Sequence, residues 1–165
     1  MMKNVLKQIF SFILPVTVLV IIPLWVEKEW TFQLSFHLLA GFLLMLSGLT
    51  LMFITISSFI KIGKGTLAPW SPPKKLVIKG PYRYVRNPMI IGVLTVLLGE
   101  ALAFLSKSIL IWAGEFFVIN IIYFIIYEEP NLENRFGEQY REYKKNVNTW
   151  VRRIKPYDPQ QSDEL

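Results

Sequence analysis

The chain alternates four long apolar stretches with shorter polar segments. Charged side chains are almost absent from residues 8–26, 30–60, 87–106 and 108–127. The exceptions are Glu100 and Glu115. Each stretch reaches the roughly 20 residues that a helix needs to cross a hydrocarbon core of about 30 Å. The pattern predicts an all-α integral membrane protein with four transmembrane helices, at about 8–26, 32–62, 88–105 and 108–128.

The composition supports this fold class. The chain has 165 residues, of which 53% are hydrophobic and 18% charged, so it has room for one domain and too much apolar surface for an ordinary soluble one. We predict one membrane domain over residues 1–156 and a loose acidic tail over 157–165. The absence of cysteine excludes disulfides, thiolate metal sites and cysteine nucleophiles, and we predict no metal site.

The first apolar stretch has a second interpretation, as a cleaved signal peptide, because Lys3 and Lys7 precede it. Its apolar core is longer than a typical signal core. Residues 27–30 do not form a small-residue cleavage site. We therefore expect the stretch to remain as a membrane helix.

The lysines and arginines predict the orientation in the membrane. Four crossings place the N-terminus, the 61–86 loop and the C-terminal segment on one side, with all of the 18 basic residues except Lys28 and Lys107. By the positive-inside rule this side is the cytoplasm. Anionic lipid headgroups account for the net charge of +6, so no nucleic-acid partner is needed.

Three further patterns describe how the elements are arranged. Gly41, Gly48 and Thr55 recur every seven residues, which favours close approach of a neighbouring helix. Four prolines between residues 66 and 81 predict a loop. A helical spacing of apolar residues predicts an amphipathic helix over 130–147, lying on the membrane surface or capping the bundle. Its apolar positions are Leu132, Phe136, Tyr140, Tyr143 and Val147.

The last two crossings are joined only by residues 106–108, which predicts a tight antiparallel hairpin. Residues equally far from Lys107 along the chain then lie at equal depth. Asn87 comes level with Glu128 at the cytoplasmic face, and Glu100 comes level with Glu115 near the opposite face.

Asn87 and Pro88 favour a helix start, because asparagine is a preferred N-cap and proline a preferred first residue. That structural role is sufficient by itself. A functional role is also open, because the free N–H groups and the positive dipole end of a helix attract a carboxylate. The pair therefore indicates either a cap alone or a cap that also binds a carboxylate ligand.

Glu128 and Glu129 are adjacent acids at the expected end of a helix, where acids are unfavourable. They are either a solvated helix end or a site in which one acid holds an ammonium group and the other orients it or accepts a proton. One wall would then bind a carboxylate and the opposite wall an ammonium group, which together fit an amino-acid zwitterion. Tyr82 and Tyr84 add aromatic faces, although interfacial anchoring is the commoner role of such tyrosines.

His37, Glu100 and Glu115 are expected at similar depth in the outer half of the membrane, where ionisable groups are costly and usually paired. They indicate either a structural polar cluster or a site for a substrate headgroup.

Two blocks of this sequence resemble the membrane-embedded methyltransferases that include isoprenylcysteine carboxyl methyltransferase and the phospholipid N-methyltransferases. The resemblance covers about residues 63–156. The first block consists of Lys75-Leu76-Val77, Gly80-Pro81-Tyr82-Arg83, Arg86-Asn87-Pro88-Met89 and Gly92. The second consists of Glu128-Glu129, Leu132, Phe136-Gly137, Tyr140 and Tyr143.

The resemblance implies S-adenosylmethionine as the cofactor, whose methionine end is a zwitterion, and a lipid or lipidated substrate that enters from the bilayer. The cofactor-binding residues that it implies are Lys75, Leu76, Val77, Tyr82, Asn87, Pro88, Met89, Ile90 and Glu128. We take Glu129, Asn87 and Arg86 as the candidate catalytic residues, with Glu129 as the group that would remove a proton from an amine acceptor.

The chain departs from the isoprenylcysteine enzymes at two positions. Those enzymes have a histidine before the proline, whereas this chain has Asn87, as some phosphatidylethanolamine methyltransferases do, and asparagine cannot take a proton. They also carry an arginine one helical turn before the acid pair, where this chain has Phe124. The loss of that arginine argues against an isoprenylcysteine substrate.

Two other function classes stay open at the level of sequence. A membrane reductase of the sterol-reductase type shares a similar arginine-proline region and would use NADPH. A non-catalytic membrane adaptor is the third class. The acceptor, the choice between N- and O-methylation and the oligomeric state are not determined by these residues.

Overall fold

The computed structural model describes residues 13–30, 34–63 and 75–159, and all regular elements in these ranges are helical. The predicted all-α fold class is therefore confirmed for the described part of the chain. In order, the elements are α2 (Ile13–Val16), η1 (Thr17–Ile21), α3 (Ile22–Val26), α4 (Phe36–Ser58), η2 (Phe59–Gly63), η3 (Gly80–Arg83), α5 (Pro88–Ala103), α6 (Lys107–Tyr123), η4 (Phe124–Glu128), α7 (Glu129–Phe136) and α8 (Glu138–Asn146).

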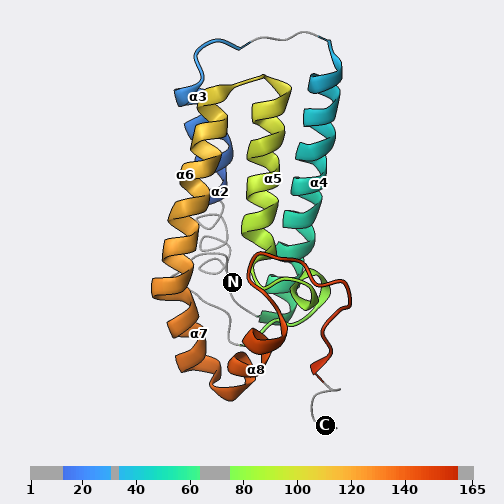
Figure 1. Ribbon diagram of the computed structural model, residues 1–165, viewed down its shortest axis with the longest axis vertical. Helices are drawn as coiled ribbons and strands as arrows, with labels where there is room; N and C mark the ends of the chain where they lie inside the picture. The colour runs from blue at the N-terminus through green and yellow to red at the C-terminus, as the bar shows by residue number, and fades with distance from the viewer. Residues whose placement is uncertain (1–12, 31–33, 64–74, 160–165) are drawn as a thin grey trace, which may run out of the picture.

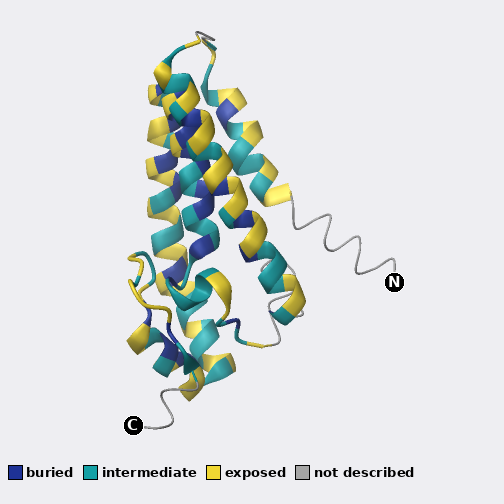
Figure 2. Ribbon diagram, turned by 90° about the vertical axis from the view of Figure 1, so that its right-hand side faces the viewer, coloured by how far each residue is buried: buried dark blue, intermediate teal, exposed yellow. Residues whose placement is uncertain are grey.

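The long helices stand side by side, with α2 to α3 beside α6 and α5 between α6 and α4 (Figure 1). Among the described residues, two helical stretches, 36–63 and 107–136, are long and apolar enough to cross a membrane. Only 22% of the most apolar window of each is buried, whereas the core helix of a soluble protein is mostly buried. Exposed residues follow the outer faces of the helices (Figure 2). The helices 13–26 and 88–103 are apolar but shorter.

Parts of four predictions lie outside the described residues. They are positions 8–12 of the first helix, positions 32 and 33 of the second, most of the loop predicted over 66–81, and positions 160–165 of the predicted tail.

Two π-helical turns, η1 and η4, each end two residues before a proline, Pro23 and Pro130. A proline has no N–H to donate, and its ring crowds the carbonyl one turn earlier. In both helices the residue before the proline donates its N–H to the carbonyl five residues back, which widens the turn. Both helices therefore continue through their prolines.

In a π-helical turn the Val18 carbonyl would accept a hydrogen bond from the backbone N–H of residue 23. Residue 23 is a proline and has no N–H, so a side chain of another helix supplies the donor. The indole N–H of Trp112, on α6, donates to that carbonyl at 3.1 Å. This bond ties the first helix to α6.

Helices α4 and α5 pack almost backbone to backbone, as the stripe of small residues predicts. A Cβ added to Gly48 would lie 2.7 Å from the carbonyl oxygen of Gly92, and one added to Gly41 would lie 2.6 Å from that of Gly99. The partner stripe on α5, Gly92 and Gly99, has the same seven-residue spacing and was not recognised in the sequence. Any side chain at these positions would separate the two helices.

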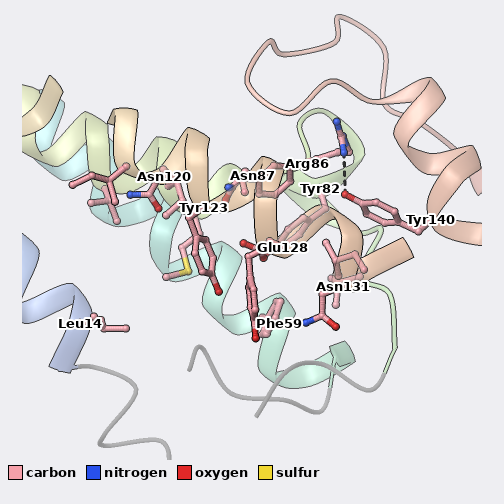
Figure 3. Close-up of a pocket in the computed structure, with 18 of the residues that line it drawn as sticks. Leu14, Phe59, Tyr82, Arg86, Asn87, Asn120, Tyr123, Glu128, Asn131 and Tyr140 are labelled. Atoms are coloured by element: carbon pink, nitrogen blue, oxygen red, sulfur yellow. Dashed lines mark hydrogen bonds between the residues drawn. The ribbon is translucent and has the colours of Figure 1, made fainter. Parts of the chain in front are cut away.

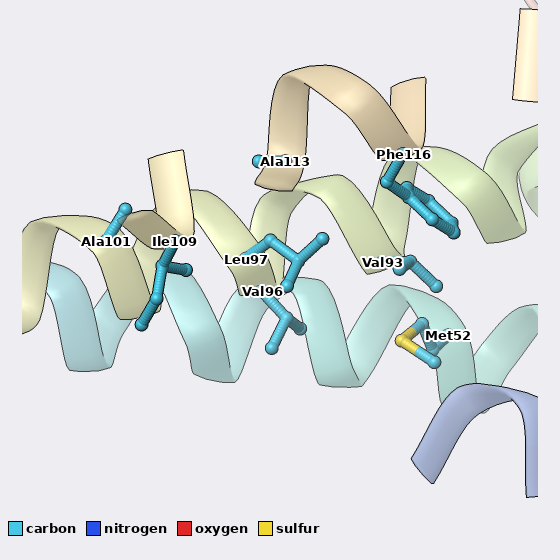
Figure 4. Packing of buried hydrophobic residues seen from close by; sticks show 8 residues of the cluster. All are labelled: Met52, Val93, Val96, Leu97, Ala101, Ile109, Ala113 and Phe116. Atoms are coloured by element: carbon cyan, nitrogen blue, oxygen red, sulfur yellow. The ribbon is translucent and has the colours of Figure 1, made fainter. Parts of the chain in front are cut away.

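The predicted hairpin between α5 and α6 is confirmed, and Ser106 is its central residue. Its Oγ accepts a hydrogen bond from the Ile109 N–H at 3.0 Å, which caps α6, and donates one to the carboxylate of Glu27. The main apolar core fills the space where α4, α5 and α6 meet (Figure 4). Its members are Met52, Val93, Val96, Leu97, Ala101, Ile109, Ala113 and Phe116.

The C-terminal region differs from its prediction in three ways. The helix predicted over 130–147 is two helices, because Gly137 has a φ of 55° between α7 and α8. The acid pair does not end a helix, since α6, η4 and α7 form one continuous stretch to Phe136. Residues 157 and 158 of the predicted tail are not loose, because Tyr157 is buried and Asp158 forms an ion pair with Arg83.

The apolar positions predicted for the amphipathic helix do pack together, as a second core that caps the bundle. Tyr140, Tyr143 and Val147 are almost fully buried there with Tyr157. Leu76, Ile78, Leu132 and Phe136 pack around them.

Candidate functional site

A cavity of about 470 Å³ lies between α2, α5, α6 and α7, within the size range of ligand pockets. Its walls are polar at the end where α5 begins and apolar at the other end. The polar side chains at the first end include Tyr82, Arg86, Asn87, Glu128, Asn131 and Arg135. The apolar end is formed by Leu14, Val18, Val93, Trp112, Phe116 and Ile119.

Asn87 stands at the N-cap position of α5, and its side chain lines the cavity. It makes no capping hydrogen bond, and no other described residue bonds its side chain. The amide is therefore available to a ligand. The first turn of a helix also leaves backbone N–H groups without intrahelical partners, here those of Met89 and Ile90, which both line the cavity.

Glu128 lines the same cavity and has no hydrogen-bond or ion-pair partner among the described residues. Figure 3 shows Glu128, Asn87 and Tyr82 gathered at the polar end. Burial raises the pKa of the Tyr82 hydroxyl, and the nearby Glu128 carboxylate raises it further. Asn87 and Glu128 thus face one space, as the hairpin predicted, and both keep their hydrogen-bonding capacity.

Arg86 also lines the cavity, but its guanidinium donors are committed to the protein. They bond the Val147 carbonyl at 2.8 Å, the Thr149 hydroxyl at 2.5 Å, the Tyr140 hydroxyl at 2.9 Å and Oε1 of Glu129 at 2.5 Å. The bond to Tyr140 is drawn in Figure 3. Burial raises the pKa of Tyr140 to about 12, so its hydroxyl stays neutral. The side chain of Arg86 is only 8% exposed.

The C-terminal segment forms backbone hydrogen bonds with the loop that precedes α5. The backbone N–H groups of Arg86 and Asn87 donate to the carbonyls of residues 148 and 149, at 2.9 and 3.3 Å. In the other direction, the backbone N–H groups of Arg153 and Tyr157 donate to the carbonyls of residues 84 and 83, at 2.9 and 2.8 Å. We call residues 147–158 the strap. The strap holds the loop that carries Arg86 and Asn87.

The family model described as phospholipid methyltransferase matches residues 36–139, more than half of the chain. The chain belongs to the phospholipid methyltransferase family. No curated protein and no solved structure matches it. The match runs from the start of α4 into α8, so it includes both the loop before α5 and the acid pair of this family member.

The cavity of this phospholipid methyltransferase family member includes most of the residues predicted for the cofactor. Leu76, Val77, Tyr82, Asn87, Met89, Ile90 and Glu128 line it, together with the catalytic candidate Arg86. Lys75 and Pro88 do not line it. Pro88 is instead buried within the first turn of α5.

Glu129, the predicted base, does not line the cavity. Its Oε1 accepts from Arg86, and its Oε2 lies 2.9 Å from Nζ of Lys144, which also binds Glu133 at 2.8 Å. The carboxylate is 14% exposed and has a cation on each oxygen. Its position matches a structural role between α7, α8 and the loop that carries Arg86.

Sequence reasoning missed a row of cavity residues on α6, η4 and α7. They recur every three or four positions, the spacing of one helix face, and are Asn120, Phe124, Tyr127, Asn131 and Arg135. Steps of three or four residues in both directions from Glu128 reach all of these positions except Tyr127, which directly precedes Glu128 in the sequence. Phe124 is 4% exposed and lies under Arg86, whose guanidinium carbon is 5.7 Å from the ring centroid.

The structure does not join His37, Glu100 and Glu115. His37 contacts the Ser35 hydroxyl at 2.9 Å. Glu100 is buried, with Oε2 unbonded, and Glu115 is exposed. No hydrogen bond or ion pair links any two of the three within the described ranges, so the predicted polar cluster is absent there.

Proposed function

We propose that the protein transfers a methyl group from S-adenosylmethionine to a lipid or lipidated acceptor held in the membrane. One observation carries this proposal: the amide of Asn87 and the carboxylate of Glu128, to which no described residue bonds, line a single cavity. The family to which the chain belongs supports methyl transfer.

The residues present fit the methionine end of this cofactor. Glu128 would hold the ammonium group, because it is the one carboxylate among the described residues that line the cavity. The Asn87 amide and the first N–H groups of α5 would hold the carboxylate, aided by the helix dipole. Leu76, Val77 and Tyr82 offer apolar and aromatic contact to the adenosine. When bound, S-adenosylmethionine supplies an electrophilic methyl group on a sulfonium.

The apolar end of the cavity fits a hydrocarbon chain. It is walled by Val18, Val93 and Phe116, at the level of the main core. We propose four crossings, with the polar end and both termini at the cytoplasmic face. The lipid would enter between helices, and the cofactor would enter from the cytoplasm.

Alignment of acceptor and methyl donor would supply most of the catalysis, since methyl transfer is an in-line displacement. Arg86 and Glu129 act as positioning residues in this proposal, because they bond to each other while Arg86 also bonds to the strap and Glu129 to Lys144 on α8. They keep Asn87 opposite Glu128.

Replacing Glu128 by glutamine is expected to weaken the binding of S-adenosylhomocysteine about tenfold to a hundredfold, because a hydrogen bond to a charged group contributes about 1.5–3 kcal/mol. The measurement is calorimetric titration of the purified protein in detergent. Glu138→Gln is the matched control, since Glu138 is 75% exposed and, among the described residues, pairs only with Arg141. Equal affinity in wild type and Glu128→Gln would remove Glu128 from the site.

The same titration with NADPH tests the reductase alternative. Binding of NADPH without binding of S-adenosylhomocysteine would overturn the proposed function. If S-adenosylhomocysteine binds, incubation with labelled S-adenosylmethionine and a total lipid extract, followed by identification of the labelled product, would identify the acceptor.

A further inference from the structure

A second hollow, of about 460 Å³, lies at the opposite end of the bundle, between the end of α3 and the start of α6. We call it the outer groove. It is lined by Trp25, Val26, Lys28, Ser108, Ile111, Trp112 and Glu115. None of these residues is used by the proposed function except Trp112, which also lines the methyl-transfer cavity and separates the two spaces.

The outer groove contains one cation and one anion that do not pair with each other. No ion pair or hydrogen bond joins the side chains of Lys28 and Glu115, and neither side chain is bonded to any other described residue. The neighbouring acid Glu27 is already engaged, since its carboxylate accepts from the Ser106 hydroxyl and from the Glu29 N–H. The side chains of Lys28 and Glu115 are therefore both open to a ligand in the groove.

A charged carboxylate at position 115 of an apolar membrane helix costs free energy unless a cation pairs with it. It follows Lys107, the first residue of α6, by eight positions, which places its backbone about 12 Å along the helix. An exposed acid this far into an apolar helix is rare, and such acids normally pair. Helical side chains tilt toward the N-terminus, so the carboxylate is directed back toward Lys28 and Ser108.

The rest of the groove fits a lipid. Trp25 is 78% exposed, and tryptophan is favoured at headgroup level, where its ring also attracts ammonium groups. Ile111 and, one and two turns beyond Glu115, Val118 and Ile122 are each more than half exposed. These side chains form an apolar track for acyl chains that starts at the groove.

We propose that the outer groove binds the headgroup of a zwitterionic phospholipid, with Lys28 and Ser108 at the phosphate and Glu115 and Trp25 at the ammonium group. The lipid belongs to the leaflet opposite the polar end of the methyl-transfer cavity. This site is independent of methyl transfer and would exist even if the proposed function were wrong.

The test is native mass spectrometry of the full chain, released from nanodiscs of equal parts phosphatidylcholine and phosphatidylglycerol. The wild type is expected to retain phosphatidylcholine about tenfold over phosphatidylglycerol, because only the former supplies an ammonium to Glu115. Glu115→Gln should abolish this preference. Lys28→Gln should lower retention of both lipids, because both carry the phosphate.

Glu29→Gln and Lys107→Gln are the matched controls, since these residues lie nearby but do not line the groove, and they should leave the preference unchanged. Glu128→Gln should also leave it unchanged, which shows that the retained lipid is not in the methyl-transfer cavity. If Glu115→Gln does not fold, Trp25→Ala, a change to a side chain that is mostly exposed, should lower the preference instead. No preference in the wild type, or a preference that survives in Glu115→Gln, would overturn the site.

Discussion

Replacing Gly48 by leucine is expected to prevent formation of the folded bundle. The first atom of any side chain there would lie 2.7 Å from the carbonyl oxygen of Gly92 and 2.9 Å from the backbone nitrogen of Val96. Backbone atoms cannot move aside without moving the whole of α5. Even Gly48→Ala should lower the free energy of unfolding by about 1–3 kcal/mol, the usual cost of overpacking.

Gly114 provides the matched control, because it lies in the middle of α6 and a Cβ there would meet nothing within 4 Å. Gly114→Ala should keep the stability or raise it by about 0.5–1 kcal/mol, through helix propensity. The measurements are the yield of monodisperse protein in detergent and its thermal midpoint. A Gly48→Leu variant that melts with the wild type would show that α4 and α5 do not pack through this stripe.

Replacing Arg86 by alanine should cost about 3–5 kcal/mol of folding free energy, the range for breaking a buried ion pair. The change removes four hydrogen bonds and leaves the Val147 carbonyl and one oxygen of Glu129 without their donor. The strap should then detach from the loop before α5. Trypsin should cut after Arg152 and Arg153 much faster than in the wild type.

Arg141→Ala is the control for this change. Its ion pair with Glu138 is more than half exposed on both sides, and such pairs contribute about 0–1 kcal/mol. Arg86→Lys keeps the charge but not the planar set of donors, so it should lie between wild type and Arg86→Ala. If the alanine variant matched the wild type in stability and in cleavage rate, the strap would not depend on Arg86.

The same variants show whether Arg86 affects ligand binding by positioning the loop or by contacting the ligand directly. The Arg86 donors bond to the strap, to Glu129 and to Tyr140, so the loss of Arg86 should weaken binding of S-adenosylhomocysteine only through displacement of Asn87. Arg86→Lys should therefore restore part of the affinity along with part of the stability. The Glu128→Gln variant, in contrast, should lose affinity while the strap stays protected from trypsin.

The sequence by itself determined the long helices and one pair of facing residues. Runs of apolar residues marked the long helices, and a three-residue connection required the hairpin that brings Asn87 level with Glu128. The seven-residue spacing of Gly41 and Gly48 also predicted close packing. All of these depend on local pattern or on counting along a helix, which the order of residues specifies directly.

The tertiary structure alone decided which acid faces the cavity and what holds the loop. Glu128 and Glu129 differ by about 100° around the helix, and the π turn before Pro130 sets which of them points inward. The pairing of the strap with residues 83–87 joins segments more than 60 positions apart, and neither segment has a repeating pattern. Contacts of this kind depend on where the chain returns in space, so the order of residues alone did not reveal them.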